Sequence, residues 1–347
     1  MSSLFKKVKS KINMMIYKDK FEDEVFITKS FDKINQASKN QIFKKSFGKK
    51  NPNKKFLVIK RSPSGGFFSN FIYVLKQMQY AYNNNFVPFV DMKNFPTKYN
   101  QRKNTNNIKN VWELYFNQIS NYKIDEIYSS KNVYFSKTKI NTGLGDYKNK
   151  FLKQIFKKNI KIKTNILREA NEFFKKNLKN HYSVGIHFRG TDQKISPGHE
   201  LPPTIYDMRI FIDKLIKNKK NLKIFLVTEQ LDYYNKLSIE YNKYICSYNS
   251  FRTNEIKDFN DCKRENHRNR LGSESLVEGI LLSKCKQLVY CDSNIPLFSL
   301  FISKKKINRF RFNYGLKSKK IIIANIQWYL TILPISYVKF LIYKIFN

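Results

Sequence analysis

Short apolar runs of strand length alternate with longer segments of helical periodicity along most of the chain. Strand-like runs occur at 56–59, 86–91, 132–135, 182–186, 222–227, 244–245 and 288–290. Helical patterns occur at 71–82, 112–116, 148–158, 163–179, 204–219, 230–241 and 273–284. This alternation is typical of parallel sheets covered by helices. The sequence therefore predicts an α/β protein whose two parallel-sheet domains face a central cleft, the default place for a ligand.

The length of the chain also favours two domains, because 347 residues exceed what one hydrophobic core usually holds. Four segments are predicted along the chain. They are a basic N-terminal tail at 1–53, a first domain at 54–179, a second domain at 180–316 and an amphipathic C-terminal helix at 317–347.

The chain is strongly basic, since 66 Lys and Arg against 26 Asp and Glu give a formal charge of +40. Such a field attracts nucleotides, anionic lipids and acidic glycans. The chain is also rich in Asn, Ile, Phe and Tyr, which together with Lys are what an AT-rich coding sequence yields. The charge alone therefore identifies no partner. Interleaved Lys and aromatic residues leave a non-catalytic membrane- or nucleic-acid-binding protein as an alternative. Because no nucleic-acid motif is recognised, we expect no nucleic-acid partner.

The cysteines and the N-terminus bear on the cellular compartment. Cys246, Cys262, Cys285 and Cys291 show neither a CxxC pattern nor zinc-ligand spacing. No apolar segment of signal-peptide type follows the N-terminal lysines. Both observations favour a cytoplasmic, thiol-reducing location.

One hexapeptide, from His187 to Asp192, combines His, Arg, Thr and Asp. It follows the strand-like run 182–186 and opens a polar loop that ends near Pro203. Open α/β sheets place ligand groups at this carboxyl edge of their strands. The planar fork of Arg189 suits bidentate contact with phosphate. The segment is therefore a candidate site for a phosphorylated sugar donor; the alternative is a solvated loop.

Two further segments have polar groups next to predicted helix or strand ends. Gly65 and Gly66 precede a helix whose backbone N–H groups can meet an anion, although neither GxGxxG nor a P-loop is present and a simple turn is the alternative. Glu274 and Glu278 share one face of a predicted helix, and Ser293 with Asn294 follow the next strand. A solvated acidic face and a helix cap are the alternatives here.

Taken together, these three segments resemble the fucosyltransferase superfamily that unites protein O-fucosyltransferases with α1,6-fucosyltransferases. Gly65–Asn70 is similar to its Gly-rich turn, His187–Asp192 to its His-x-Arg-x-Thr-Asp motif, and Glu278–Asn294 to its final acidic-helix and Ser-rich segment. The resemblance spans roughly residues 55 to 303. It implies a GT-B-like fold of two Rossmann-like domains, and inverting, metal-independent transfer of fucose from GDP-fucose to a glycan. Use of another nucleotide-sugar donor on the same fold is the alternative.

The resemblance also assigns roles to residues of this sequence. Arg189 would act on the leaving diphosphate, and Glu278 would read guanine in a place where the family more often has Asp. For the general base we choose Glu200, with His199 as the alternative, although some members work without an obvious protein base. The predicted donor-binding residues are Gly66, Asn70, His187, Arg189, Thr191, Asp192, Glu278, Ser293 and Asn294.

No cofactor is expected besides the donor substrate. The chain contains no Asp-x-Asp sequence, so a chelated divalent metal has no obvious ligands. We therefore predict no metal site.

The C-terminal stretch 321–338 has no charged residue but contains Asn325, Gln327 and Pro334, and lysines flank it. It is too polar to be convincing as a membrane span. One interpretation is a helix in the headgroup region at the inner face of the membrane, which suits a lipid-linked glycan acceptor. The other is a helix that packs back on the first domain.

Overall fold

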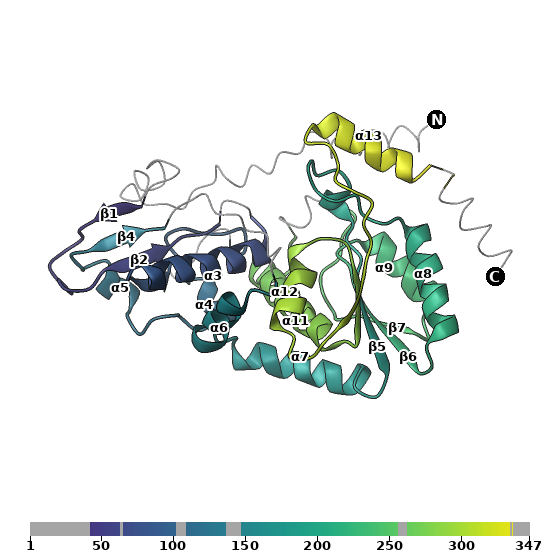
Figure 1. Cartoon of the computed structure of the whole chain (residues 1–347), viewed down its shortest axis with the longest axis horizontal. Helices are drawn as coiled ribbons and strands as arrows, with labels where there is room; N and C mark the ends of the chain where they lie inside the picture. The colour runs from purple at the N-terminus through teal and green to yellow at the C-terminus, as the bar shows by residue number, and fades with distance from the viewer. Residues whose placement is uncertain are drawn as a thin grey trace.

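The computed structural model describes residues 42–62, 65–101, 109–136, 147–255, 262–333 and 335. Its two sheets lie side by side along the long axis of the molecule, with helices around and between them (Figure 1). Within the described residues, no helix is long and apolar enough to cross a membrane.

The first sheet has the strand order β1-β4-β2-β3. Its strands are β1 (Phe43–Lys45), β2 (Phe56–Ile59), β3 (Val87–Val90) and β4 (Val133–Phe135). All four residues of β2 are buried, and β2 pairs in parallel with both β3 and β4. Strands buried on both faces read as continuous apolar runs, which is why β2 is visible in the sequence. The edge strand β1 pairs antiparallel with β4 inside the predicted N-terminal tail, so the first sheet begins before residue 54.

The described residues of this half form five helices. They are α3 (Phe67–Asn83), α4 (Trp112–Tyr115), α5 (Ile124–Ile127), α6 (Lys150–Asn159) and α7 (Thr164–Asn177). Helix α3 connects β2 to β3 and buries most of its first three turns. Helix α7 packs against α11 (His267–Lys284) of the second half, although the sequence groups it with the first domain.

The second sheet is parallel throughout and has the order β7-β6-β5-β8-β9. Its strands are β5 (Tyr182–His187), β6 (Leu222–Val227), β7 (Ile245–Cys246), β8 (Gln287–Tyr290) and β9 (Asn308–Arg311). The strand order reverses between β5 and β8. In open α/β sheets a ligand binds beyond the carboxyl ends of the strands at such a point.

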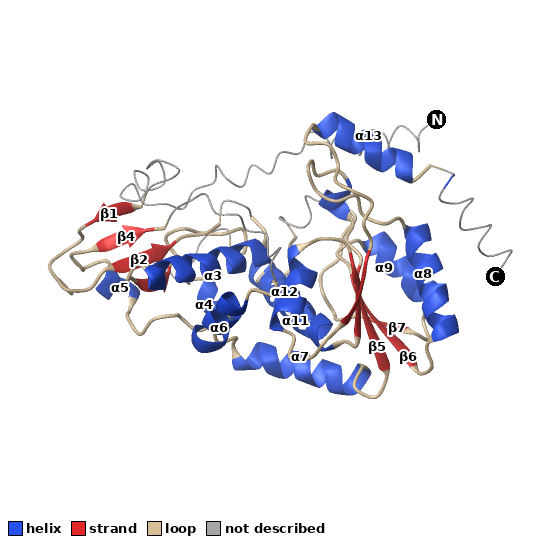
Figure 2. Cartoon of the chain, in the orientation of Figure 1, coloured by secondary structure: helices blue, strands red, loops and turns tan. Residues whose placement is uncertain are grey.

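Helices cover both faces of the second sheet. α8 (Ile205–Asn218) and α9 (Leu231–Glu240) lie on one face, and α11 with α12 (Asn294–Ile302) lie on the other (Figure 2). The short 3-10 helix η2 (Thr191–Lys194) follows β5, and α13 (Ile321–Thr331) follows β9. The two parallel-strand, helix-covered sheets confirm the predicted α/β architecture.

A continuous apolar core joins the two halves through α12. The ring of Phe298 lies 4.4 Å from that of Phe68 and 5.0 Å from that of Phe71, centroid to centroid. A Cβ atom on Gly279 would come within 2.9 Å of Phe298 and 3.0 Å of Phe68, so glycine lets α11 approach this cluster. The Tyr115 hydroxyl donates to the Asn269 carbonyl oxygen across the same boundary, at 2.9 Å. The halves thus meet in a packed apolar interface.

Candidate donor site at the carboxyl edge of the second sheet

The loop after β5 is fixed by two side chains that follow β6. Glu229 Oε1 accepts hydrogen bonds from the Gly190 backbone N–H at 2.9 Å and from the Thr191 hydroxyl at 2.8 Å. Gln230 Oε1 accepts from the Thr191 backbone N–H at 2.8 Å and from the Lys194 ammonium group at 2.8 Å. The predicted donor-binding residue Thr191 therefore directs its hydroxyl toward Glu229 and holds the loop in place.

The loop is also conformationally constrained. A Cβ atom on Gly190 would lie 2.5 Å from Gln230 Oε1 and 2.7 Å from the Gln230 Cβ atom, so glycine is required for this close approach. Thr191 has a φ of 28°, which is unusual for a β-branched residue. Such local strain persists where the surroundings over-determine the backbone, and it is frequent at ligand sites.

Arg189 and His187 differ in exposure and charge. The Arg189 side chain is 32% exposed, and its Nε lies 3.9 Å from Glu229 Oε1. His187, at the end of β5, is 2% exposed. Burial, with a smaller contribution from Arg189, lowers the pKa of His187 to about 3, so the imidazole is neutral at physiological pH. Within the described residues its buried Nδ1 has no hydrogen-bond partner.

The neighbouring end of β8 leads into the amino-terminal turn of α12. Ser293 is the N-cap residue of this helix, and its buried Oγ also has no partner among the described residues. Asn294 Nδ2 donates to Ser69 Oγ at 3.0 Å, which joins this turn to α3 of the first half. Two buried polar atoms that lack a partner among the described residues, His187 Nδ1 and Ser293 Oγ, therefore belong to residues at or just beyond the carboxyl ends of adjacent strands. Polar ligand groups and a helix amino terminus of this kind suit an anion.

Gly66 and Asn70 form the turn on the first-half side. Asn70 Oδ1 accepts from the Ser62 backbone N–H at 2.8 Å, and its Nδ2 donates to the Gly66 carbonyl oxygen at 3.1 Å. Asn70 is 6% exposed and Gly66 is the N-cap residue of α3. In this structure Asn70 organises the turn, and the turn reaches α12 through Ser69.

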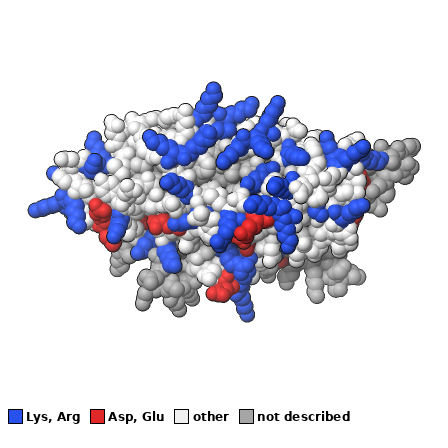
Figure 3. Space-filling model, turned by 90° about the horizontal axis from the view of Figure 1, so that it is seen from below, with Lys and Arg blue, Asp and Glu red and all other residues white. Residues whose placement is uncertain are grey.

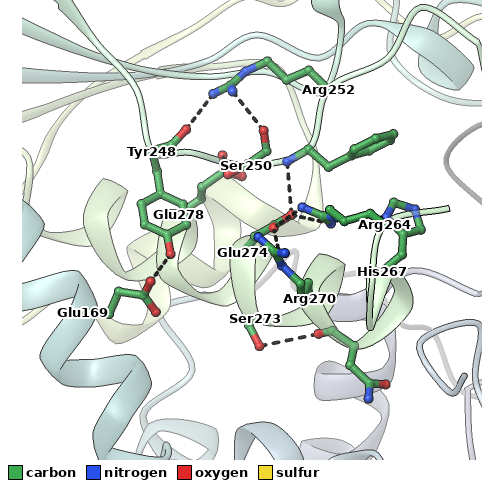
Figure 4. Close-up of polar contacts among 12 residues, drawn as sticks. Glu169, Tyr248, Ser250, Arg252, Arg264, His267, Arg270, Ser273, Glu274 and Glu278 are labelled. Atoms are coloured by element: carbon green, nitrogen blue, oxygen red, sulfur yellow. Dashed lines mark hydrogen bonds and ion pairs between the residues drawn. The ribbon is translucent and has the colours of Figure 1, made fainter. Parts of the chain in front are cut away.

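Glu274 and Glu278 form a buried acidic face on α11 beneath the loop that follows β7 (Figure 4). Ser250 Oγ donates to Glu278 Oε1 at 2.5 Å. Arg264 forms a bidentate pair with Glu274 at 2.6 and 3.2 Å. Desolvation raises the pKa of Glu278 to about 7, and Ser250 and Arg252 partly offset it. The alternative interpretation from the sequence, in which Glu274 and Glu278 form a solvated acidic face, is therefore wrong.

Glu200 and His199 occupy different environments. Glu200 is 5% exposed; its Oε2 accepts from the Asp292 backbone N–H at 2.6 Å, and its Oε1 is paired with the Arg311 guanidinium. Arg311 also lies 2.9 Å from Asp292 Oδ2. His199 is exposed on the same loop. The carboxylate of Glu200 therefore ties this loop to the residue that precedes Ser293. The side chain of Asp192 lies outside the described part of the structure.

Several site residues were missed from the sequence: Glu229, Gln230, Ser250 and Arg311. Glu229 and Gln230 directly follow the predicted strand 222–227, so the rule that selected His187–Asp192 would also have found them. Ser250 and Arg311 lie in segments without a motif, and only the tertiary structure places them.

Potential metal ligands do not gather in the described part of the chain, where no group of three or more His, Cys, Asp or Glu side chains could hold an ion. The predicted independence from metal stays a prediction that requires an activity measurement.

The fold can be compared with known proteins. Neither a protein-family model nor a curated protein sequence matches the chain. Among solved structures, NodZ α-1,6-fucosyltransferase co-crystallized with GDP matches with a TM-score of 0.50 and 13% identity, over 71% of this chain and 92% of that chain. This chain has a fucosyltransferase-like fold.

Two further solved structures are similar to the chain. The fucosyltransferase NodZ from Bradyrhizobium matches with a TM-score of 0.50 and 13% identity, over 71% of this chain and 91% of that chain. A mutant of Arabidopsis thaliana FUT1 in complex with GDP matches with a TM-score of 0.43 and 11% identity, over 88% of this chain and 77% of that chain. The fucosyltransferase-like fold confirms the predicted GT-B-like class, and the roles of individual residues stay predictions.

Proposed function

We propose that the protein is a glycosyltransferase that transfers fucose from GDP-fucose to a glycan acceptor. The observation that carries this proposal is the placement of Arg189, His187 and Ser293 at the carboxyl ends of β5 and β8, where the strand order of the second sheet reverses. The fucosyltransferase-like fold supports the same chemistry, and the similar NodZ structure was crystallized with GDP.

In the proposed reaction an acceptor hydroxyl oxygen attacks the anomeric carbon of fucose and forms the new glycosidic bond. The bond from that carbon to the β-phosphate oxygen breaks, and the electron pair leaves with GDP. Arg189 and the backbone N–H groups at the start of α12 would stabilise the charge that grows on the diphosphate. His187 is neutral and would contribute a hydrogen bond without a charge.

We assign recognition of the guanine base to Glu278. An ionised carboxylate can accept hydrogen bonds from guanine N1–H and from the exocyclic amine. Ser250 fixes one carboxylate oxygen, and a pKa of about 7 means that a substantial fraction is ionised at neutral pH. Uracil and cytosine do not present this pair of donors, so the arrangement favours GDP over UDP or CDP.

The proton of the acceptor hydroxyl needs a base, and His199 and Glu200 are the candidates. Glu200 is buried and its carboxylate is engaged by Arg311 and the Asp292 N–H. His199 is exposed, where an acceptor can reach it. This geometry favours His199 as the base and a positioning role for Glu200, which would hold the loop that leads into α12.

The proposal is tested by calorimetry with GDP, UDP and CDP, followed by a GDP-release assay with GDP-fucose. We expect GDP to bind at least about tenfold more tightly than UDP, because each lost hydrogen bond to a buried charged group costs about 1.5–3 kcal/mol. Tighter binding of UDP or CDP would show another donor on the same fold. Absence of binding to all three nucleotides would refute the enzyme assignment.

A further inference from the structure

The C-terminal helix α13 has one face on the protein and one face in solvent. Ala324, Asn325 and Trp328 are 0–5% exposed and face the body of the molecule. Ile322, Ile326 and Leu330 are 71%, 51% and 58% exposed at successive four-residue steps. This spacing gives a continuous apolar stripe, hereafter the α13 stripe. Leu333 and Ile335, just beyond the helix, are also exposed.

The orientation of α13 is set by contacts with the loop that follows η2. The Gly198 backbone N–H donates to the Ser318 carbonyl oxygen at 3.0 Å, and the Lys317 N–H donates to the His199 carbonyl oxygen at 2.9 Å. Ser318 N–H in turn donates to Gln327 Oε1 at 2.7 Å. The helix thus packs on the second half of the protein, not on the first domain as one sequence interpretation held. These contacts direct the α13 stripe outward.

Basic residues flank the α13 stripe in the sequence. In the sequence, Lys317, Lys319 and Lys320 precede α13, Lys339 and Lys344 follow it, and no Asp or Glu occurs between Ser293 and Asn347. Lys319 and Lys320, at the amino end of α13, are exposed. An apolar stripe bordered by cations matches an anionic lipid surface, where apolar side chains enter the acyl boundary and lysines meet phosphate headgroups. A second copy of the chain would instead bring like charges together.

Positive charge is not confined to the face of the molecule that carries α13. Lys and Arg also cover much of the side of the molecule where α7 lies, seen from below in Figure 3 and facing away from α13. The α13 stripe is distinguished by the combination of charge with exposed Ile and Leu.

We propose that the α13 stripe binds the surface of anionic membranes and holds the enzyme there peripherally. This proposal does not depend on which nucleotide-sugar donor the protein binds.

The test is sedimentation of the full-length protein with phosphatidylcholine vesicles that contain or lack 30% phosphatidylglycerol. The test variant replaces Ile322, Ile326 and Leu330 by Gln, and the control is Ile239→Gln, which alters an equally exposed apolar residue on α9 (78% exposed). We expect the wild type and the control to bind anionic vesicles, and the triple variant to bind at least about tenfold more weakly. At high salt the wild type should keep part of its binding, because burial of apolar groups is not screened.

Three outcomes would overturn the proposal. They are a wild type that ignores anionic vesicles, a triple variant that binds like the wild type, and a wild-type dimer that the triple variant converts to a monomer without any effect on vesicle binding. Equal melting temperatures of the variants, measured without lipid, show that the comparison concerns folded proteins.

Discussion

At the scale of single residues, Arg189 is the most direct test of the donor site. Arg189→Lys keeps the positive charge but loses the planar fork that can contact two phosphate oxygens. We expect turnover to fall by about 100-fold or more, because stabilisation of the leaving group is lost in the transition state. The control is Arg209→Lys, whose ion pair with Glu240 on α8 and α9 lies outside the site. Near-native turnover of the Arg189 variant would make this residue peripheral.

Substitutions at Glu200 distinguish a positioning role of this residue from a role as general base. Glu200→Gln removes the charge but keeps an acceptor for the Asp292 N–H. If Glu200 positions the start of α12, turnover should fall by no more than about tenfold, and Glu200→Ala should weaken GDP binding as well. If Glu200 is the base, the Gln variant should lose about 100-fold or more in turnover with unchanged GDP affinity. Calorimetry and steady-state kinetics on both variants distinguish the two cases, with Glu240→Gln as the control.

The raised pKa of Glu278 predicts that GDP affinity and folding stability both depend on pH. Its pKa in the fold, about 7, is above the ordinary value of 4.5, so the folded protein retains a proton that the unfolded chain releases. The contribution to stability is therefore complete below pH 4.5 and is lost as the pH rises to about 7. Recognition of guanine needs the ionised form, so GDP affinity should increase from pH 6 to pH 8. Calorimetry with Glu278→Gln should show a flatter profile; an equal slope in both proteins would contradict the assignment.

At the scale of helices and strands, the sequence predicted best where burial is most complete. β2 and β6 were predicted at their observed bounds, since Phe56–Ile59 and Leu222–Val227 are continuous apolar runs. Helix α12 was missed because it is apolar on every side and has no helical periodicity; Pro296 is accepted in its first turn. β9 was missed because all four of its residues are exposed at the sheet edge. The His187–Asp192 loop was found from its residue types and its place after a strand. Glu229 and Gln230 have the same place after β6, but their contact with the loop follows from the pairing of β5 with β6, which the sequence does not show.

The packing of α12 against α3 gives a prediction for stability. Phe298 is fully buried between the two halves. Phe298→Ala should lower the free energy of unfolding by about 3–5 kcal/mol, because it removes apolar contacts and leaves a cavity. Phe310→Ala on β9, where the side chain is 40% exposed, should cost far less. Denaturant unfolding of both variants measures the difference, and equal losses would show that the interface contributes little.

At the scale of the whole molecule, the reaction should proceed without a divalent metal. Fixed cations and helix N–H groups would supply the stabilisation of the diphosphate that a metal supplies in other transferases. We expect GDP release from GDP-fucose to continue in the presence of EDTA at an unchanged rate. Loss of the activity with EDTA, and its recovery with Mn²⁺, would show that the donor is bound in a different way.

The aromatic contact between α12 and α3 has a consequence for how the two substrates bind. The start of α12 borders the proposed diphosphate position, and Asn294 joins it to Ser69 in the turn that opens α3. Since packed interiors deform little, any shift of α12 on donor binding would be transmitted to that turn. An acceptor that contacts this turn would then bind as a ligand thermodynamically linked to the donor. Whatever factor GDP exerts on the affinity of the acceptor, the acceptor exerts on the affinity of GDP.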